Sequence, residues 1–169
     1  SETVIPMIEE GKKRVWSDYQ KEIPDDHYFY VRSCIRQSFF PGSEQFFLRF
    51  MRDILGKDFF ENPSHTTCTG IGYHADVVPF QTIQTVVARH FALMKESGYK
   101  NIAISCVTSF GIYTEIIETW KHFPQELEKV REFLYKATGR EFDVLKNMSH
   151  TRVFLYNFRY EMAAEAQYL

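Results

Sequence analysis

The segment His27-Tyr28-Phe29-Tyr30-Val31-Arg32-Ser33-Cys34 joins a run of aromatic and β-branched residues to a cysteine. Such residues favour extended backbone, so the run over 28–31 predicts a strand. The segment Asn101-Ile102-Ala103-Ile104-Ser105-Cys106 has the same form, an apolar strand that leads into a cysteine. The sequence therefore predicts two strands that are each followed by a thiol.

Helical spacing separates and follows these strands. After a break at Pro41-Gly42, Ser43 is the expected N-cap of a helix that ends at Gly56, and a longer helix is expected over 79–97, ending before Gly98. Their predicted apolar stripes are Phe46, Phe47, Phe50, Met51 and Ile54 in the first helix and Ile83, Val86, Val87, His90, Phe91 and Met94 in the second.

The remaining segments continue the alternation of strands and helices. The predicted elements are a short strand over 58–60, a turn-rich loop over 61–75, helices over 110–120 and 124–137, a strand over 141–144 and a helix over 148–166. This order predicts an α/β fold with a mainly parallel sheet flanked by helices. Residues 1–26 are polar and broken by Pro6 and Pro24, so we expect an N-terminal arm followed by a single domain over 27–169.

Composition narrows the functional classes. The 169 residues are 44% hydrophobic and 25% charged, which is typical of one soluble globular domain. The formal net charge of −2 supplies no basic excess for phosphates, so nucleic acid is not an expected partner. No apolar run approaches the ~18 residues of a membrane span, and the first ten residues lack a signal-peptide pattern, so we expect a cytoplasmic protein.

Aromatic residues make up 17% of the chain, which is more than a small core readily hides. Aromatic side chains are enriched at the cores of protein interfaces. We therefore expect part of one phenylalanine-rich region to form a docking patch: Phe39, Phe40, Phe46, Phe47, Phe50, Phe59 and Phe60.

Three cysteines, Cys34, Cys68 and Cys106, are widely spaced along the chain. Two of them follow predicted strands, and ligands of open α/β sheets bind at the carboxyl ends of strands. Thiolates are soft ligands that suit zinc or an iron–sulfur cluster, with His65 or His74 as the nearest imidazoles to Cys68. The alternative is that all three are ordinary buried residues, because free cysteine is often buried and no C-x-x-C pair is present.

Other polar groups near the cysteines allow further interpretations. Cys106 could act as a nucleophile with hydrogen bonds from Thr108 and Ser109, since a helix start lowers a thiol pKa. His74 and Asp76 could form an acid–base pair, or Asp76 could simply cap the next helix. The Gly70-x-Gly72 pair is interpreted as loop geometry beside Cys68 rather than as a phosphate-binding loop.

Four segments together resemble a cysteine-rich CCG domain, most closely that of the B subunit of heterodisulfide reductase and its bacterial relatives. They are Cys68-Thr-Gly-Ile-Gly-Tyr-His-Ala-Asp, Thr85-Val-Val-Ala-Arg-His, Ser97-Gly-Tyr-Lys-Asn-Ile and Cys106-Val-Thr-Ser-Phe-Gly. The resemblance covers about residues 27–160. It implies that Cys34 matches the family's first cysteine, Cys68 the second of its Cys-Cys pair and Cys106 the first of its C-x-x-C pair.

The sequence departs from the family pattern at two positions. Thr67 stands at the first cysteine of the pair, and Ser109 stands at the last cysteine of C-x-x-C. The resemblance implies a cofactor held by Cys34, Cys68 and Cys106, with His74 as a candidate fourth donor. That cofactor is expected to be an iron–sulfur cluster, with zinc or a site without metal as alternatives.

The resemblance implies a subunit of a heterodisulfide-reductase-like complex that passes electrons to a disulfide or thiol substrate. Its expected partners are flavin and iron–sulfur subunits and a second CCG polypeptide. The alternative is a degenerate CCG domain that acts as a structural or assembly subunit with zinc or no metal. A third interpretation is an independent thiol enzyme that uses Cys106 with His74.

Overall fold

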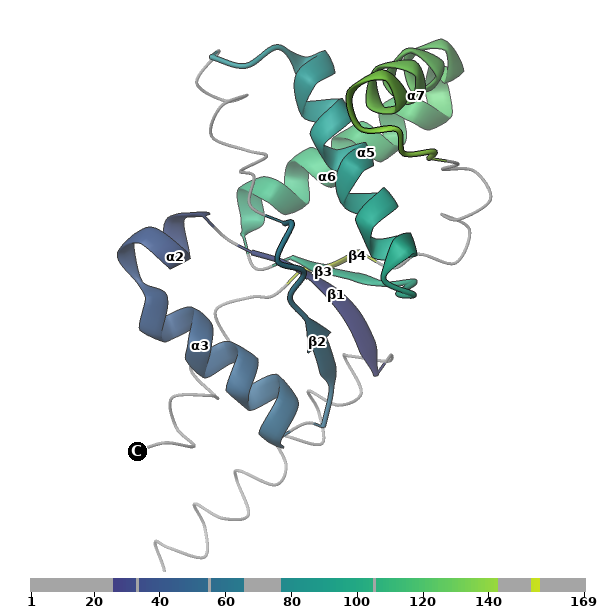
Figure 1. Cartoon of the computed structure of the whole chain (residues 1–169). Coiled ribbons are helices and arrows are strands. Elements are labelled where there is room, and N and C mark those ends of the chain that lie inside the picture. The colour runs from purple at the N-terminus through teal and green to yellow at the C-terminus, as the bar shows by residue number, and fades with distance from the viewer. Residues whose placement is uncertain are drawn as a thin grey trace, which may run out of the picture.

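The computed structural model describes residues 26–32, 34–54, 56–65, 77–104, 106–142 and 153–155 (Figure 1). These residues form a sheet of four parallel strands in the order β2-β1-β3-β4, namely β1 (His27–Val31), β2 (Asp58–Phe60), β3 (Ile102–Ile104) and β4 (Val153–Leu155). Helices flank the sheet, so the predicted α/β fold with a parallel sheet is confirmed. The expected N-terminal arm lies outside the described residues except at its last position.

The strand order places a topological switch point between β1 and β3. The chain runs from β1 to β2 on one side and then crosses back to place β3 on the other side of β1. In the β1–β3 register, Val31 lies opposite Ile104, so the two strands end level with each other. In such sheets the crevice at the carboxyl ends of the diverging strands is where ligands bind.

One face of the sheet is covered by the helices that connect β1 to β2. They are α2 (Cys34–Phe39), α3 (Pro41–Arg49) and the π-helical segment η1 (Phe50–Ile54). Side chains alternate along a strand, so Tyr28 and Tyr30 share a face of β1. The Tyr30 ring lies 5.9 Å from the Phe47 ring of α3, and the Tyr30 hydroxyl donates to Glu44 Oε1 at 2.7 Å. This small aromatic layer fixes α3 against the sheet.

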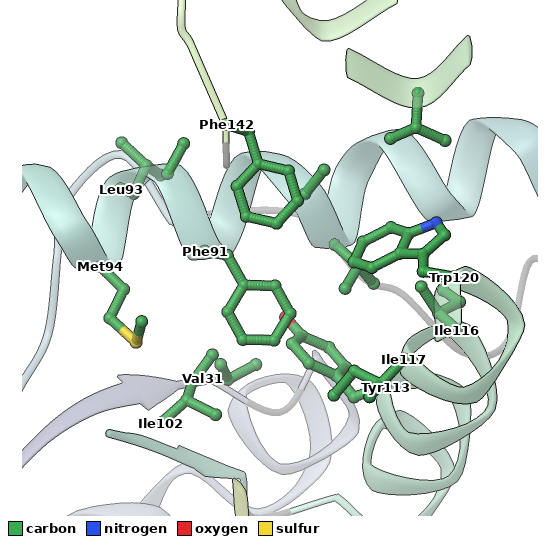
Figure 2. Packing of buried hydrophobic residues seen from close by; sticks show 14 of the residues in the cluster. Val31, Phe91, Leu93, Met94, Ile102, Tyr113, Ile116, Ile117, Trp120 and Phe142 are labelled. Atoms are coloured by element: carbon green, nitrogen blue, oxygen red, sulfur yellow. The ribbon is translucent and has the colours of Figure 1, made fainter. Parts of the chain in front are cut away.

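The larger core lies on the opposite face, where Phe29 and Val31 of β1 meet α5 (Phe80–Glu96), α6 (Val107–His122) and α7 (Pro124–Thr138). Figure 2 shows the Phe91 ring of α5 between the strand residues and Phe142. The Phe91 and Phe142 rings stack at 5.9 Å, and Trp120 meets Phe142 edge-on at 5.7 Å. Helix α7 packs on α5 and α6 and ends at Gly139, whose positive φ of 69° suits glycine.

Most predicted elements between 27 and 139 are confirmed, with shifted helix starts. Helix α3 begins at Pro41, where a break was expected before Ser43, because proline is well tolerated in the first turn of a helix. Helix α6 begins at 107 rather than 110. In the stripe of α5, only Val86 is incompletely buried.

Two predictions for the C-terminal region are wrong where the structure describes it. Residues 153–155 were expected within a helix but form β4, paired with β3. The open edge of β3 offers unpaired backbone groups, and this tertiary pairing outweighs the local helical pattern. Residues 141 and 142 were expected in a strand, yet Phe142 is buried against the helices. Among the helices in the described ranges, none has the length and apolar character needed to cross a bilayer.

Candidate functional site at the carboxyl edge of the sheet

Two of the three cysteines leave the sheet at the switch point. Cys34 begins α2, three residues after β1 ends, and Cys106 precedes the first residue of α6, two residues after β3 ends. Because Val31 and Ile104 are register partners, both cysteines follow neighbouring strands at one edge. Both are partly exposed and neither forms a disulfide. The prediction that thiols follow the carboxyl ends of strands is therefore confirmed for Cys34 and Cys106.

The other residues of the expected site lie outside the described residues. These are Thr67, Cys68, Gly70, Gly72, His74 and Asp76. Within the described ranges no group of three or more His, Cys, Asp or Glu side chains converges to hold a metal ion. The chemistry of Cys34 and Cys106 suits a soft metal, but a tetrahedral site needs donors beyond these two. The complete ligand set of Cys34, Cys68, Cys106 and His74 stays a prediction.

The first turn of α6 carries the residues expected to assist Cys106. Ser109 is buried and Thr108 is half-buried, one turn or less beyond the cysteine. No side-chain cap bond is made by Cys106 at the helix start. The nucleophilic role of Cys106 also stays a prediction.

A pair of buried imidazoles lies next to this edge, on the α5 side of β1. His65 follows β2 and is 1% exposed, and His90 in the middle of α5 is 0% exposed. Their ring centroids are 4.2 Å apart, and His90 Nδ1 is hydrogen-bonded to the Tyr113 hydroxyl of α6. In the described part of the chain, both ring nitrogens of His65 and Nε2 of His90 have no hydrogen-bond partner.

Two arginines accompany the imidazoles. Arg32 directly follows β1, and its buried Nε lies 3.6 Å from Glu61 Oε1, beyond hydrogen-bond distance. Arg89 donates from Nη2 to the Ser64 carbonyl at 2.8 Å, while its buried Nη1 finds no partner among the described residues. Glu61 also accepts a bond from Arg52 at 3.2 Å, so its single charge is shared. Among the described residues, the charges around His65 and His90 are therefore net positive.

This environment keeps both imidazoles neutral. Burial, and then the nearby charges of Arg32 and Arg89, lower the pKa of His65 to about 4, although the residue's own backbone acts in the opposite direction. Burial, His65 and Arg89 hold the pKa of His90 well below its usual range. Burial raises the pKa of the Tyr113 hydroxyl, which therefore stays protonated at neutral pH.

Unpartnered buried polar groups are unusual in a folded protein. Each one costs about 1–3 kcal/mol, so native structures rarely keep several together without a ligand or water. In the sequence, His65 stands out only as an imidazole close to Cys68, and His90 falls within an apolar stripe. For His90, the available signal was a polar imidazole on the apolar stripe of an amphipathic helix, directly after Arg89.

No protein-family model matches the chain. It is 28% identical over 137 residues to a protein of Methanosarcina acetivorans named as the B subunit of ferredoxin:CoB-CoM heterodisulfide reductase. The match covers 81% of this chain and 43% of the relative, so the chain spans less than half the length of that protein. This similarity supports a distant relationship to the B subunit of heterodisulfide reductase.

Proposed function

We propose that the chain is a subunit of a heterodisulfide-reductase-like redox complex and holds a thiolate-bound metal centre, an iron–sulfur cluster. The main support is the position of Cys34 and Cys106, which follow neighbouring parallel strands at the switch point of the sheet. The distant similarity to the B subunit of heterodisulfide reductase agrees with this role.

The proposed reaction is the two-electron reduction of a disulfide. One S–S bond breaks, two electrons and two protons are taken up, and two thiols leave. The relative's name gives ferredoxin and the CoB-CoM heterodisulfide as its reactants. For this chain we propose that flavin or iron–sulfur subunits of the same complex deliver the electrons, and that a second CCG polypeptide is part of the complex.

The residues proposed to hold the centre are Cys34, Cys68 and Cys106, with His74 as a candidate fourth donor. When bound, an iron–sulfur cluster supplies one-electron transfer at a potential set by its charge and surroundings. The chain itself orients Cys34 and Cys106 through the first turns of α2 and α6. Partial exposure of both residues leaves the edge open to a substrate or partner.

Metal analysis of the full chain, purified without oxygen, tests this proposal. Iron with inorganic sulfide is expected, and Cys34→Ser, Cys68→Ser and Cys106→Ser should each lose most of it. The matched control is Ser38→Ala, an exposed position at the end of α2 that should leave metal content unchanged. Unaltered iron in the Cys68→Ser variant would rule out the proposed ligand set.

A structural or assembly role is the second candidate. Phe39, the last residue of α2, and Phe40, which follows it, are 73% and 61% exposed, which suits a surface that docks on a catalytic partner. The proposed replacement of two ligand cysteines by Thr67 and Ser109 also favours this role. Stoichiometric zinc, or no metal at all, in the same anaerobic preparation would support it over the redox role.

A further inference from the structure

We propose that Arg32, His65, Arg89 and His90 form a binding site for a small oxyanion group, such as phosphate, sulfonate or carboxylate. None of these side chains is among the proposed ligands of the metal centre, and the oxyanion site needs no metal. It goes beyond the proposed function, because it would exist whether or not the chain reduces disulfides.

The four residues come from three segments that the fold brings together. Arg32 follows the carboxyl end of β1, His65 follows β2, and Arg89 and His90 lie in the middle of α5. The Phe29 ring of β1 meets the His65 ring edge-on at 6.1 Å, which places His65 between the strand and α5. Figure 1 shows α5 and α6 above the sheet, on the side opposite α3.

The cluster contains more hydrogen-bond donors than acceptors. Guanidinium groups only donate, and each neutral imidazole offers one donor and one acceptor. His90 Nδ1 and the Tyr113 hydroxyl are hydrogen-bonded, and in the tautomer in which the hydroxyl donates, Nε2 of His90 carries the proton and is a further donor. Arg32 Nε, Arg89 Nη1, His90 Nε2 and both ring nitrogens of His65 are buried without hydrogen-bond partners in the described part of the chain, and donors outnumber acceptors among them. An oxyanion supplies several acceptors at once.

Charge distinguishes an anion from a metal ion at this place. Arg89 forms no ion pair among the described residues, and Arg32 shares Glu61 with Arg52. Both guanidinium groups lie near enough to His65 to lower its pKa. A cation between His65 and His90 would be repelled by these charges, whereas an anion would be attracted and held by charge-assisted hydrogen bonds.

Another buried polar side chain in the same core does have a hydrogen-bond partner, so a lack of partners is not general in this fold. Gln84, also on α5, is 2% exposed and accepts a 2.8 Å hydrogen bond from Trp120 Nε1. That pair is self-sufficient. The imidazole–arginine cluster differs because its polar atoms have no partners among the described residues, which indicates a ligand.

Titration of the full chain with inorganic phosphate tests the site. Binding is expected by calorimetry, together with shifts of two histidine ring nitrogens in ¹⁵N spectra, assigned by their absence in His65→Leu and His90→Leu. At a phosphate concentration about 100 times Kd, the Tm should rise by about 5–10 °C. Phosphate should also raise the pKa of His65, because a bound anion favours the charged imidazole.

Arg89→Gln should weaken phosphate binding by about tenfold to a hundredfold. The matched control is Arg131→Gln on α7, an exposed arginine paired with Glu128, which should bind like the unmodified chain. If Arg89→Gln does not fold, Arg32→Gln and the histidine spectra of the unmodified chain provide the same test. Equal binding by Arg89→Gln and Arg131→Gln, or unshifted rings at saturating phosphate, would overturn the site.

Titration with zinc tests the alternative of a metal site. If zinc but not phosphate shifts the ¹⁵N signals of the same two histidine rings, the proposal is overturned.

Two further ligands distinguish the possible sources of the oxyanion. Stronger displacement of phosphate by 3-mercaptopropionate than by propionate would indicate the anionic group of a thiol substrate, and equal displacement would indicate a free ion. Absence of phosphate binding by the unmodified chain, with iron and sulfide present in it, would reject this site alone and leave the proposed function standing.

Discussion

Helix α5 carries two buried polar residues in different circumstances, Gln84 and His90. The Gln84 side chain, near the start of α5, accepts a hydrogen bond from Trp120, near the end of α6. The His90 ring, in the middle of α5, lies 4.2 Å from the His65 ring at a tilt of 42°, and its Nε2 is unpartnered within the described ranges. The first is a completed internal contact, and the second is an incomplete one beside the candidate site.

This difference separates residues that stabilise the fold from residues kept for a ligand. A buried hydrogen bond that is already satisfied adds about 0.5–1.5 kcal/mol to stability. A buried donor without a partner subtracts from stability until something binds it. Substitution of Gln84 and substitution of a residue of the imidazole pair should therefore change stability in opposite directions.

The largest effect on stability is expected at the hydrogen-bonded pair of Trp120 and Gln84. Trp120→Ala should lower the free energy of unfolding by about 3–5 kcal/mol, because it removes a 1% exposed ring that packs on Phe142 and bonds to Gln84. Urea denaturation measures this change. Tyr135→Ala on the exposed side of α7 is the control and should change stability by less than about 0.5 kcal/mol. Equal losses at both positions would contradict the assigned core.

The second effect is a pH dependence of the free energy of unfolding, which arises from the unpartnered imidazole of His65. The pKa of His65 is about 4 in the folded chain and near 6.5 when unfolded, so below pH 6.5 the unfolded state binds more protons. The contribution of His65 to stability should therefore be complete above pH 6.5 and fall toward pH 4, by up to about 1.4 kcal/mol per pH unit. Denaturation in phosphate-free chloride buffers checks this. His65→Leu should show a clearly smaller slope, and an unchanged slope would place the sensitivity elsewhere.

The smallest effects are expected from two leucine substitutions, one at the hydrogen-bonded Gln84 and one at the unpartnered His65. Gln84→Leu leaves Trp120 Nε1 without its acceptor and should destabilise the chain by about 1–3 kcal/mol. His65→Leu removes two unpartnered nitrogens at similar volume and should stabilise it by about 1 kcal/mol. Thermal unfolding without added oxyanions compares them. The same sign in both variants would show that the imidazole pair is structural.

Much of the fold could be predicted from local pattern. The strand over 28–31, the strand before Cys106 and the helix that ends at Gly139 depend on β-branched residues, apolar periodicity and a glycine cap, all of which are local. The helix prediction for residues 153–155 is wrong for a nonlocal reason. Pairing with the open edge of β3 decides that segment, and no local propensity encodes the distant strand.

The sequence by itself determined the α/β class and the placement of Cys34 and Cys106 directly after strands, because strand-forming residues and cysteines are adjacent along the chain. Only the tertiary structure decided that β1 and β3 are neighbours, which brings those two cysteines to one edge. It alone also placed His65 against His90, since their approach results from packing between α5, α6 and the sheet. Burial and unpaired donors are properties of that packing, so they appear only when the chain is folded.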